Sequence, residues 1–238
     1  MRTFADWDEQ RAGFLEIDLV AHCGVTTEGE YLHTLTLTDI HTTWTECVAL
    51  LNRSQQQVKE AIIAVRQRLP FPLLGLDSDN GSEFLNANLK RYCEQEHITF
   101  TRSRPYKKND QAHVKQKNWT HVRQFVGYGR FEGPTACSAL EALYEPLRRY
   151  MNFFQPTLKL VRKETVGGKV HKRYDTAQTP YQRLLLSPEV SEETKMQLRR
   201  LYETLNPVAL LRQLDRLQDQ LWTLETVRFT SEATLPQE

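Results

Sequence analysis

The sequence contains no long apolar run and no pair of closely spaced cysteines. Because a helix needs about 20 apolar residues to cross a membrane, we expect no transmembrane segment. The N-terminus, MRTFADWDEQRAG, is polar and carries acids, so it does not resemble a signal peptide. The four cysteines are scattered, which argues against a zinc knuckle and favours a reducing, cytosolic setting with buried thiols: Cys23, Cys47, Cys93 and Cys137.

An excess of charge of one sign is also missing, since the formal net charge is +1. The distribution is less even, with seven cations against one acid in 102–123 and six cations against one acid in 158–173. Two basic stretches on a nearly neutral chain indicate a surface that binds a polyanion, with ordinary solvated charge as the alternative. The 238 residues, 39% hydrophobic and 26% charged, are typical of a soluble globular protein with one domain and a smaller appendage.

Hydrophobic periodicity predicts five strands, at 14–23, 30–40, 41–51, 72–79 and 98–103. Helices are predicted between and after them, at 54–69, 82–97, 112–126 and 136–153. Three strands in a meander, followed by strand–helix–strand crossovers, predict an α/β fold with a mixed sheet and helices on both faces.

The pattern changes after Pro156. Residues 158–175 predict a basic β-hairpin that turns at Gly167–Gly168, and the rest of the chain predicts helices at 179–187, 191–205 and 207–225. The last helix carries a leucine stripe, which packs on its own domain or, as the alternative, dimerises: Leu210, Leu214, Leu217, Leu221 and Leu224.

Two carboxylates lie where chemistry is plausible. Asp18 lies within an apolar strand, on the same face as Glu16. Asp79 lies where a buried strand ends and a helix begins, the place where α/β sheets tend to hold ligands. Taken alone, each has a plain structural explanation, either as the solvent face of an edge strand or as turn chemistry.

A lysine lies on the apolar side of helix 112–126. Helical spacing places Lys115 on one face with Ala112, Trp119, Val122 and Val126. We therefore expect the ammonium group of Lys115 to point inward, which is an unusual position for a charge.

The stretches EIDLV, DSDNGSEF and SRPYKKNDQAHV together resemble the catalytic core of the retroviral-integrase superfamily, in particular insertion-sequence transposases. The resemblance covers roughly 14–154, and QKNWTHVR and KVHKRYDTAQTPYQRLL also resemble that transposase group. It implies a ribonuclease-H-like fold. It also implies an organisation in which a catalytic core at 14–155 follows an N-terminal extension at 1–13 that lacks a helix-turn-helix, and precedes a C-terminal basic hairpin and helices at 156–238.

The resemblance further implies an active site. Asp18 and Asp79 would be ligands of Mg²⁺ or Mn²⁺, and a glutamate is expected thirty-five residues after the second aspartate, at position 115 (115 − 79 − 1 = 35), where this chain has Lys115. Such enzymes hold two ions about 3.5–4 Å apart. A protonated lysine has no lone pair to offer and repels a cation, so we expect at most one ion to be held tightly.

Three explanations of Lys115 are open. It is an engineered or accidental inactivating change, a mark of a naturally decayed copy, or part of a working enzyme with a rearranged metal site. In the last case the nearby acids that could substitute are Asp77, Glu83 and Asp110.

The partners implied are DNA, as transposon ends and target, and further copies of the chain on that DNA, in the bacterial cytoplasm and at the nucleoid. Tyr106 is expected to stack on a base, with packing on the sheet as the alternative. Phosphate contacts are expected from the cations of the two basic stretches: Arg104, Lys107, Lys108, Lys117, Arg123, Lys169, Lys172 and Arg173.

The favoured interpretation is a protein for DNA integration and transposition, Mg²⁺-dependent in strand cleavage and strand transfer by descent and impaired by Lys115. One alternative is a non-catalytic relative that binds nucleic acid or oligomerises and interferes with active transposases. Another is a ribonuclease-H-like nuclease. Strand joining separates the first from the third, and metal-independent DNA binding identifies the second.

Overall fold

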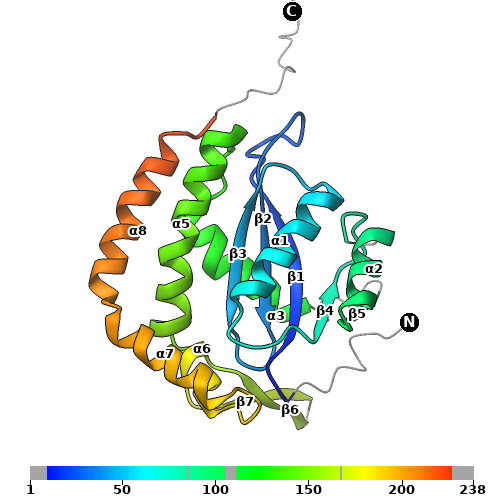
Figure 1. Ribbon diagram of the computed structural model, residues 1–238, viewed down its shortest axis with the longest axis vertical. Helices are drawn as coiled ribbons and strands as arrows, with labels where there is room; N and C mark the ends of the chain where they lie inside the picture. The colour runs from blue at the N-terminus through cyan, green and yellow to red at the C-terminus, as the bar shows by residue number, and fades with distance from the viewer. Residues whose placement is uncertain (1–9, 85, 105–110, 167, 227–238) are drawn as a thin grey trace, which may run out of the picture.

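Five strands form one mixed sheet in the order β3-β2-β1-β4-β5 (Figure 1). This computed structural model describes residues 10–84, 86–104, 111–166 and 168–226. Strand β1 is antiparallel to β2 and parallel to β4, and β2 is antiparallel to β3, so a meander is followed by parallel crossovers as predicted. The strands are β1 (Phe14–Ala21), β2 (His33–Asp39), β3 (Thr45–Leu50), β4 (Gly75–Ser78) and β5 (Thr99–Arg102).

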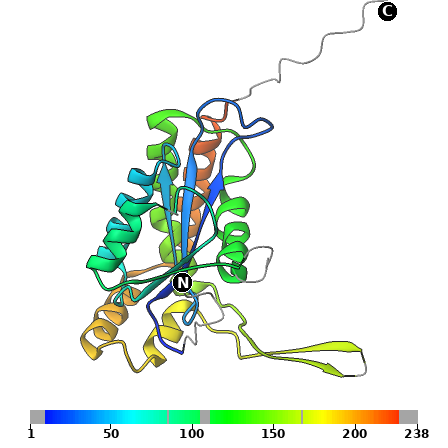
Figure 2. The same ribbon diagram turned by 90° about the vertical axis from the view of Figure 1, so that its right-hand side faces the viewer.

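Helices cover both faces of the sheet, which completes the ribonuclease-H-like fold that the sequence predicted (Figures 1 and 2). Helices α1 (Gln55–Arg68) and α2 (Ala87–Gln95) lie on one face. The other face carries a continuous helical segment made of α3 (Ala112–Lys117), the π-helix η3 (Asn118–Arg123) and α4 (Gln124–Val126).

The two faces of the sheet differ in chemistry although both are buried. The face under α1 is apolar, with side chains such as Leu15, Ile17 and Leu37 in its core. The face under α3 is polar in its centre, because β2 places alternate threonines there and β1 and β4 place acids there. These residues are buried as well: Thr34, Thr36, Thr38, Glu16 and Asp77.

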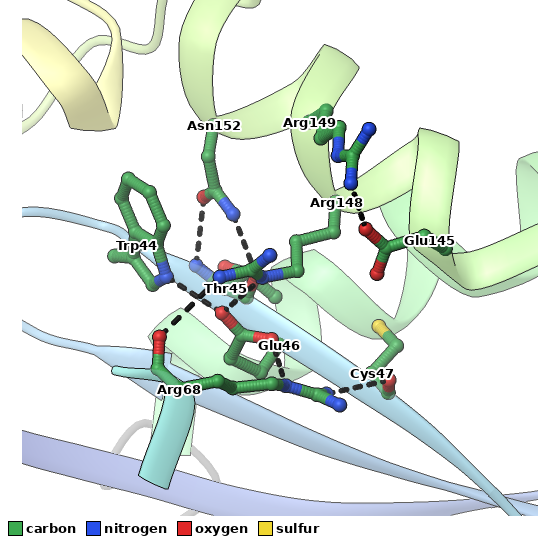
Figure 3. A network of polar contacts seen from close by, with 9 residues as sticks. All are labelled: Trp44, Thr45, Glu46, Cys47, Arg68, Glu145, Arg148, Arg149 and Asn152. Carbon is green, nitrogen blue, oxygen red and sulfur yellow. Dashed lines mark hydrogen bonds and ion pairs between the residues drawn. The ribbon is translucent and has the colours of Figure 1, made fainter. Parts of the chain in front are cut away.

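Helix α5 (Gly133–Phe154) closes the edge of the sheet at β3. The Thr45 backbone N–H donates to Asn152 Oδ1 (2.9 Å), and Asn152 Nδ2 donates to the Thr45 carbonyl (2.8 Å) (Figure 3). An edge strand otherwise presents unpaired backbone groups that invite another strand. The carboxamide of Asn152 therefore takes the place of a neighbouring strand at this position.

A buried carboxylate ties the same strand to two helices. Glu46 is fully buried and accepts hydrogen bonds from Arg68 Nε at the end of α1 (2.8 Å), Arg148 Nε on α5 (2.7 Å) and Trp44 Nε1 (2.8 Å) (Figure 3). A buried charge is tolerated when it is paired and hydrogen-bonded in this way. The network joins α1, β3 and α5 around the sheet edge.

The C-terminal part packs on the core. Helix α8 (Pro207–Trp222) lies along α5, and Leu214 and Leu221 are buried in an apolar cluster with residues of α5, so the predicted packing of the leucine stripe on its own domain is confirmed (Figure 1). Helices α6 (Pro180–Leu186) and α7 (Glu192–Thr204) precede it. Within the described residues, no helix combines the length and the apolar character needed to cross a membrane.

The predicted hairpin is present as β6 (Leu160–Val166) and β7 (Lys169–Tyr174), which project from the body of the molecule (Figure 2). Gly168 adopts φ of 79°, a left-handed conformation that favours glycine, while Gly167 lies outside the described residues.

Replacing Asn152 with leucine should remove both side-chain hydrogen bonds to the Thr45 backbone at the edge of β3. The Thr45 N–H and C=O would then be buried without a partner, at about 1–3 kcal/mol each. We expect urea denaturation to show a free energy of unfolding lower by about 2–4 kcal/mol. Glu145→Ala on the same helix, which breaks an exposed ion pair with Arg149, should cost at most about 1 kcal/mol. Equal losses in the two variants would contradict the role of Asn152.

Candidate functional site

Two aspartates meet at the carboxyl ends of neighbouring parallel strands. The register of β1 and β4 pairs Glu16 with Asp77 and Ile17 with Ser78, so one step further places Asp18 opposite Asp79. Both aspartates are partly exposed. The structure thus brings together the two acids that the sequence singled out, on the face covered by α3.

Asp18 is held by two hydrogen bonds. Its Oδ1 accepts from the Leu19 amide (2.9 Å), and its Oδ2 accepts from Asn118 Nδ2 (2.9 Å) at the start of η3. Burial and then the charge of Asp79 raise the pKa of Asp18 to about 6, against the lowering effects of the Leu19 amide, Lys115 and Asn118. Asp79 Oδ1 accepts from the Gly81 amide (2.9 Å). The two carboxylates therefore repel each other across a site that a cation would stabilise.

A second carboxylate pair lies one step deeper. Glu16 and Asp77 face each other in the register of β1 and β4, and both are fully buried. Thr101 Oγ1 on β5 donates to Asp77 Oδ1 (2.6 Å). Burial above all raises the pKa of Glu16 to about 8, and the Val114 amide opposes this rise. The inner pair is closed to solvent and anchors its surroundings, whereas the outer pair, Asp18 and Asp79, is accessible.

The inner pair fixes the start of α3 on the sheet. The Val114 amide donates to Glu16 Oε2 (2.9 Å). Gln111, which is 1% exposed, extends Nε2 toward the backbone carbonyls of Ile17 and Asp77 (3.4 Å each). Sequence reasoning did not assign roles to Glu16, Gln111 or Asn118; the one available signal was that Glu16 shares a strand face with Asp18.

The predicted inward orientation of Lys115 is wrong. Lys115 and Ala112 are exposed, and Trp119 is 51% exposed, whereas Val114 is fully buried. The charge of Lys115 still reaches the acids, since it lowers the pKa of Asp18.

The π-helical segment explains the error. A π turn contains about one residue more than an α turn. Two α-helical turns, about seven residues, before the buried Val122 lead to position 115. Because η3 contains one residue more, the residue on the same face is Val114, which is buried. The inward face at the start of the segment is therefore displaced by one residue.

Two of the predicted phosphate-contacting cations are engaged in the fold. Lys117 is 4% exposed, and burial lowers its pKa to about 8, so it is not available on the surface. Arg123 donates to the carbonyls of Gly127 (3.1 Å) and Ala21 (3.0 Å), and its guanidinium lies over the Tyr128 ring. The expectation that Lys117 is a surface cation is therefore wrong, whereas Arg123 is partly exposed and its phosphate contact stays a prediction.

The remaining predicted contacts divide into two groups. Arg104 and the β7 residues Lys169, Lys172 and Arg173 are exposed. Tyr106, Lys107 and Lys108 lie outside the described residues, as does Asp110. Of the other possible replacement acids, Asp77 belongs to the buried inner pair and Glu83 lies beside Gly81.

The donor set at the outer pair suits one hard cation. No group of three His, Cys, Asp or Glu side chains that could hold a metal is found in the described ranges. Two facing carboxylates are nevertheless suitable ligands for Mg²⁺ or Mn²⁺. Next to them, Asn118 Oδ1 is buried and has no hydrogen-bond partner among the described residues, so an oxygen without a donor lies beside Asp18.

Residues 8–108 match the family model of the integrase core domain. The matched part, which is less than half of the chain, is therefore similar to the integrase core domain. Core domains of this type generally use divalent metal ions and act in DNA recombination.

The chain is also similar to individual proteins. It is 45% identical over 183 residues to the uncharacterized protein y4rM of Sinorhizobium fredii (strain NBRC 101917 / NGR234), covering 77% of this chain and 52% of that protein. The chain thus spans about half the length of the curated relative it matches. Among solved structures it is similar to the catalytic core domain of BIV integrase, with 18% identity, a TM-score of 0.48, and coverage of 77% of this chain and 98% of that chain.

The anchoring role of Glu16 predicts how α3 responds when the acceptor is removed. Glu16→Gln keeps an oxygen for the Val114 amide, whereas Glu16→Leu does not. In EDTA, hydrogen exchange at Val114 should be faster in the leucine variant than in the glutamine variant by roughly 5- to 30-fold, the equivalent of about 1–2 kcal/mol for a buried hydrogen bond. The same exchange rate in both variants would show that α3 is positioned without Glu16.

Proposed function

We propose that this chain is the core of a transposase/integrase-type protein that binds duplex DNA, holds one divalent cation at Asp18 and Asp79, and is impaired in strand transfer. The observation that carries the proposal is the position of these two aspartates, opposite each other at the ends of neighbouring parallel strands. The integrase core match supports the class of reaction. DNA cleavage and joining, transposon ends and target as substrates, and assembly of copies on DNA are parts of this proposal.

The impairment follows from the chemistry at position 115. The bound cation would polarise an attacking hydroxyl or a leaving oxygen. Asp18 and Asp79 supply the anionic oxygens for it, but Lys115 adds a positive charge where the resemblance implies a third acid. A second cation would meet repulsion instead of a ligand.

The β6–β7 hairpin supports the DNA-binding part. In its register Arg162 lies opposite Arg173, and Lys163 lies opposite Lys172. Like charges directly opposite each other destabilise a strand pair, and β7 is exposed along its whole length. Glu164 pairs with Arg162, and within the described residues no ion pair involves Lys163, Lys172 or Arg173, so a bound anion can neutralise these three cations. A row of phosphates has the opposite charge and can neutralise these cations.

DNA binding should therefore depend on salt and on the hairpin. With about five phosphates neutralised, log K should fall with log salt at a slope of about −4 to −5, without sequence preference. The triple variant Lys169→Ala, Lys172→Ala, Arg173→Ala should reduce the magnitude of the slope by about 2–3. The measurement is fluorescence anisotropy of a labelled duplex between low and moderate salt.

A matched control removes the same number of exposed cations from the helices of the C-terminal part: Arg200, Arg212 and Arg216. This variant should keep the slope of the unmodified protein. Binding that ignores salt, or an equal loss in the two triple variants, would contradict a hairpin contact.

The second candidate, a non-catalytic DNA-binding relative that interferes with active transposases, is favoured by the exposed position of Lys115 and by the absence of a third acid at the outer pair among the described residues. It predicts the same DNA binding with or without EDTA. A ribonuclease-H-like nuclease, in contrast, would nick without joining.

Lys115→Glu should add a second cation and with it strand joining. We expect Mn²⁺ titration by calorimetry to change from one ion to two, and joining of a pre-nicked oligonucleotide to rise by about 10⁴-fold, the equivalent of about 5.5 kcal/mol in the barrier. Gln116→Glu is the control, since it adds an exposed acid one residue away and should change neither. Two ions and equal joining in the unmodified protein would show that position 115 is not the third ligand position.

A further inference from the structure

Asn118 lies closer to the outer pair than position 115 does. Its Nδ2 donates to Asp18 Oδ2 at 2.9 Å, whereas Lys115 forms no ion pair within the described part of the chain. The π segment begins at Asn118, so the displacement that turns Lys115 outward turns Asn118 toward β1.

The carboxamide of Asn118 is only half satisfied. Its Oδ1 is buried and has no hydrogen-bond partner among the described residues. Leaving a buried polar atom without a partner is costly, about 1–3 kcal/mol. Because Oδ1 has no partner among the described residues, the bond from Nδ2 to Asp18 is the one side-chain hydrogen bond there that holds the amide in its orientation.

A carboxamide can form a favourable contact both when the site has no cation and when a cation is bound. Toward a free carboxylate it presents N–H, and after a half-turn of its terminal torsion it presents oxygen. Amide oxygens are ligands for hard divalent cations, as carboxylates are. Lysine and glutamate cannot alternate in this way at neutral pH, because one only donates and the other only accepts.

We propose that Asn118 is the third protein ligand of a single divalent cation, and that its amide turns from donating to Asp18 to binding the ion through Oδ1. This inference rests on the proposed cation site at Asp18 and Asp79 and adds a ligand to it. Two carboxylates and one neutral amide carry a charge of −2, which balances one divalent cation. The same set leaves a second divalent ion without compensation, in addition to the repulsion from Lys115.

The test is a Mn²⁺ titration of the full chain by calorimetry and electron paramagnetic resonance. We expect one ion per chain. Asn118→Ala should weaken its binding by at least about 10- to 100-fold, the loss seen when partners that orient a metal ligand are removed. Asn118→Asp should bind more tightly than the unmodified protein, because it adds a carboxylate. Gln116→Ala, exposed on the same helical segment, should leave the affinity unchanged.

A second measurement uses the unmodified protein and so does not depend on the folding of a variant. On addition of Mg²⁺, the side-chain amide resonances of Asn118 should shift as the N–H···Asp18 hydrogen bond breaks, while those of Asn152, which bonds the Thr45 backbone, should stay.

The outcomes separate the two proposals. One bound ion that is lost in Asp18→Asn but is unaffected in Asn118→Ala, with unmoved Asn118 amide signals, would overturn the role of Asn118 and leave the cation site in place. No bound ion in the unmodified protein would overturn both. Loss in both variants together with the amide shift would support the ligand set of Asp18, Asp79 and Asn118.

Discussion

The hydrogen bond from the Val114 amide to the buried carboxyl of Glu16 is the constraint on which the site depends. It holds the start of α3 against the polar face of the sheet, at the level of the inner carboxylate pair. The residues that follow along the helical segment take their positions beside the outer pair from this contact. Asn118 thereby reaches Asp18, and Lys115 is turned to solvent.

The free-energy cost of burying the polar face of the sheet is offset by stabilising contacts elsewhere in the fold. On the opposite face an apolar core under α1 contributes hydrophobic stabilisation. At the β3 edge, Glu46 and Asn152 fix α1 and α5, so the sheet cannot slide or open there. The protein can then keep acids and threonines in its interior, where their hydrogen bonds are strong. Burial there raises the pKa of an acid such as Glu16.

Much of the fold could be predicted because it rests on local patterns: alternation gave the strands, a helical period gave the helices, and the strand-end position of Asp79 indicated the site. Orientation was harder. The alternation in β2 predicts a strand but does not reveal that both of its faces are buried, because α3, which covers the threonines, comes from far along the chain. Lys117 and Arg123 read as surface cations for the same reason. Only the fold shows that Lys117 is buried and that Arg123 donates hydrogen bonds to backbone carbonyls.

The π turn at Asn118–Arg123 has a consequence for the history of the chain. A π turn is an α-helix with one inserted residue, and deletion of one residue within it would restore the α period. The part of the helix before the deletion would then rotate by about 100° relative to the sheet. An insertion or a deletion can thus exchange the side chain presented to the metal-binding acids with no substitution among the site residues. Homologous proteins should accordingly be aligned at this helix by structure, because a count of residues from the second aspartate assumes a helical period that this segment does not keep.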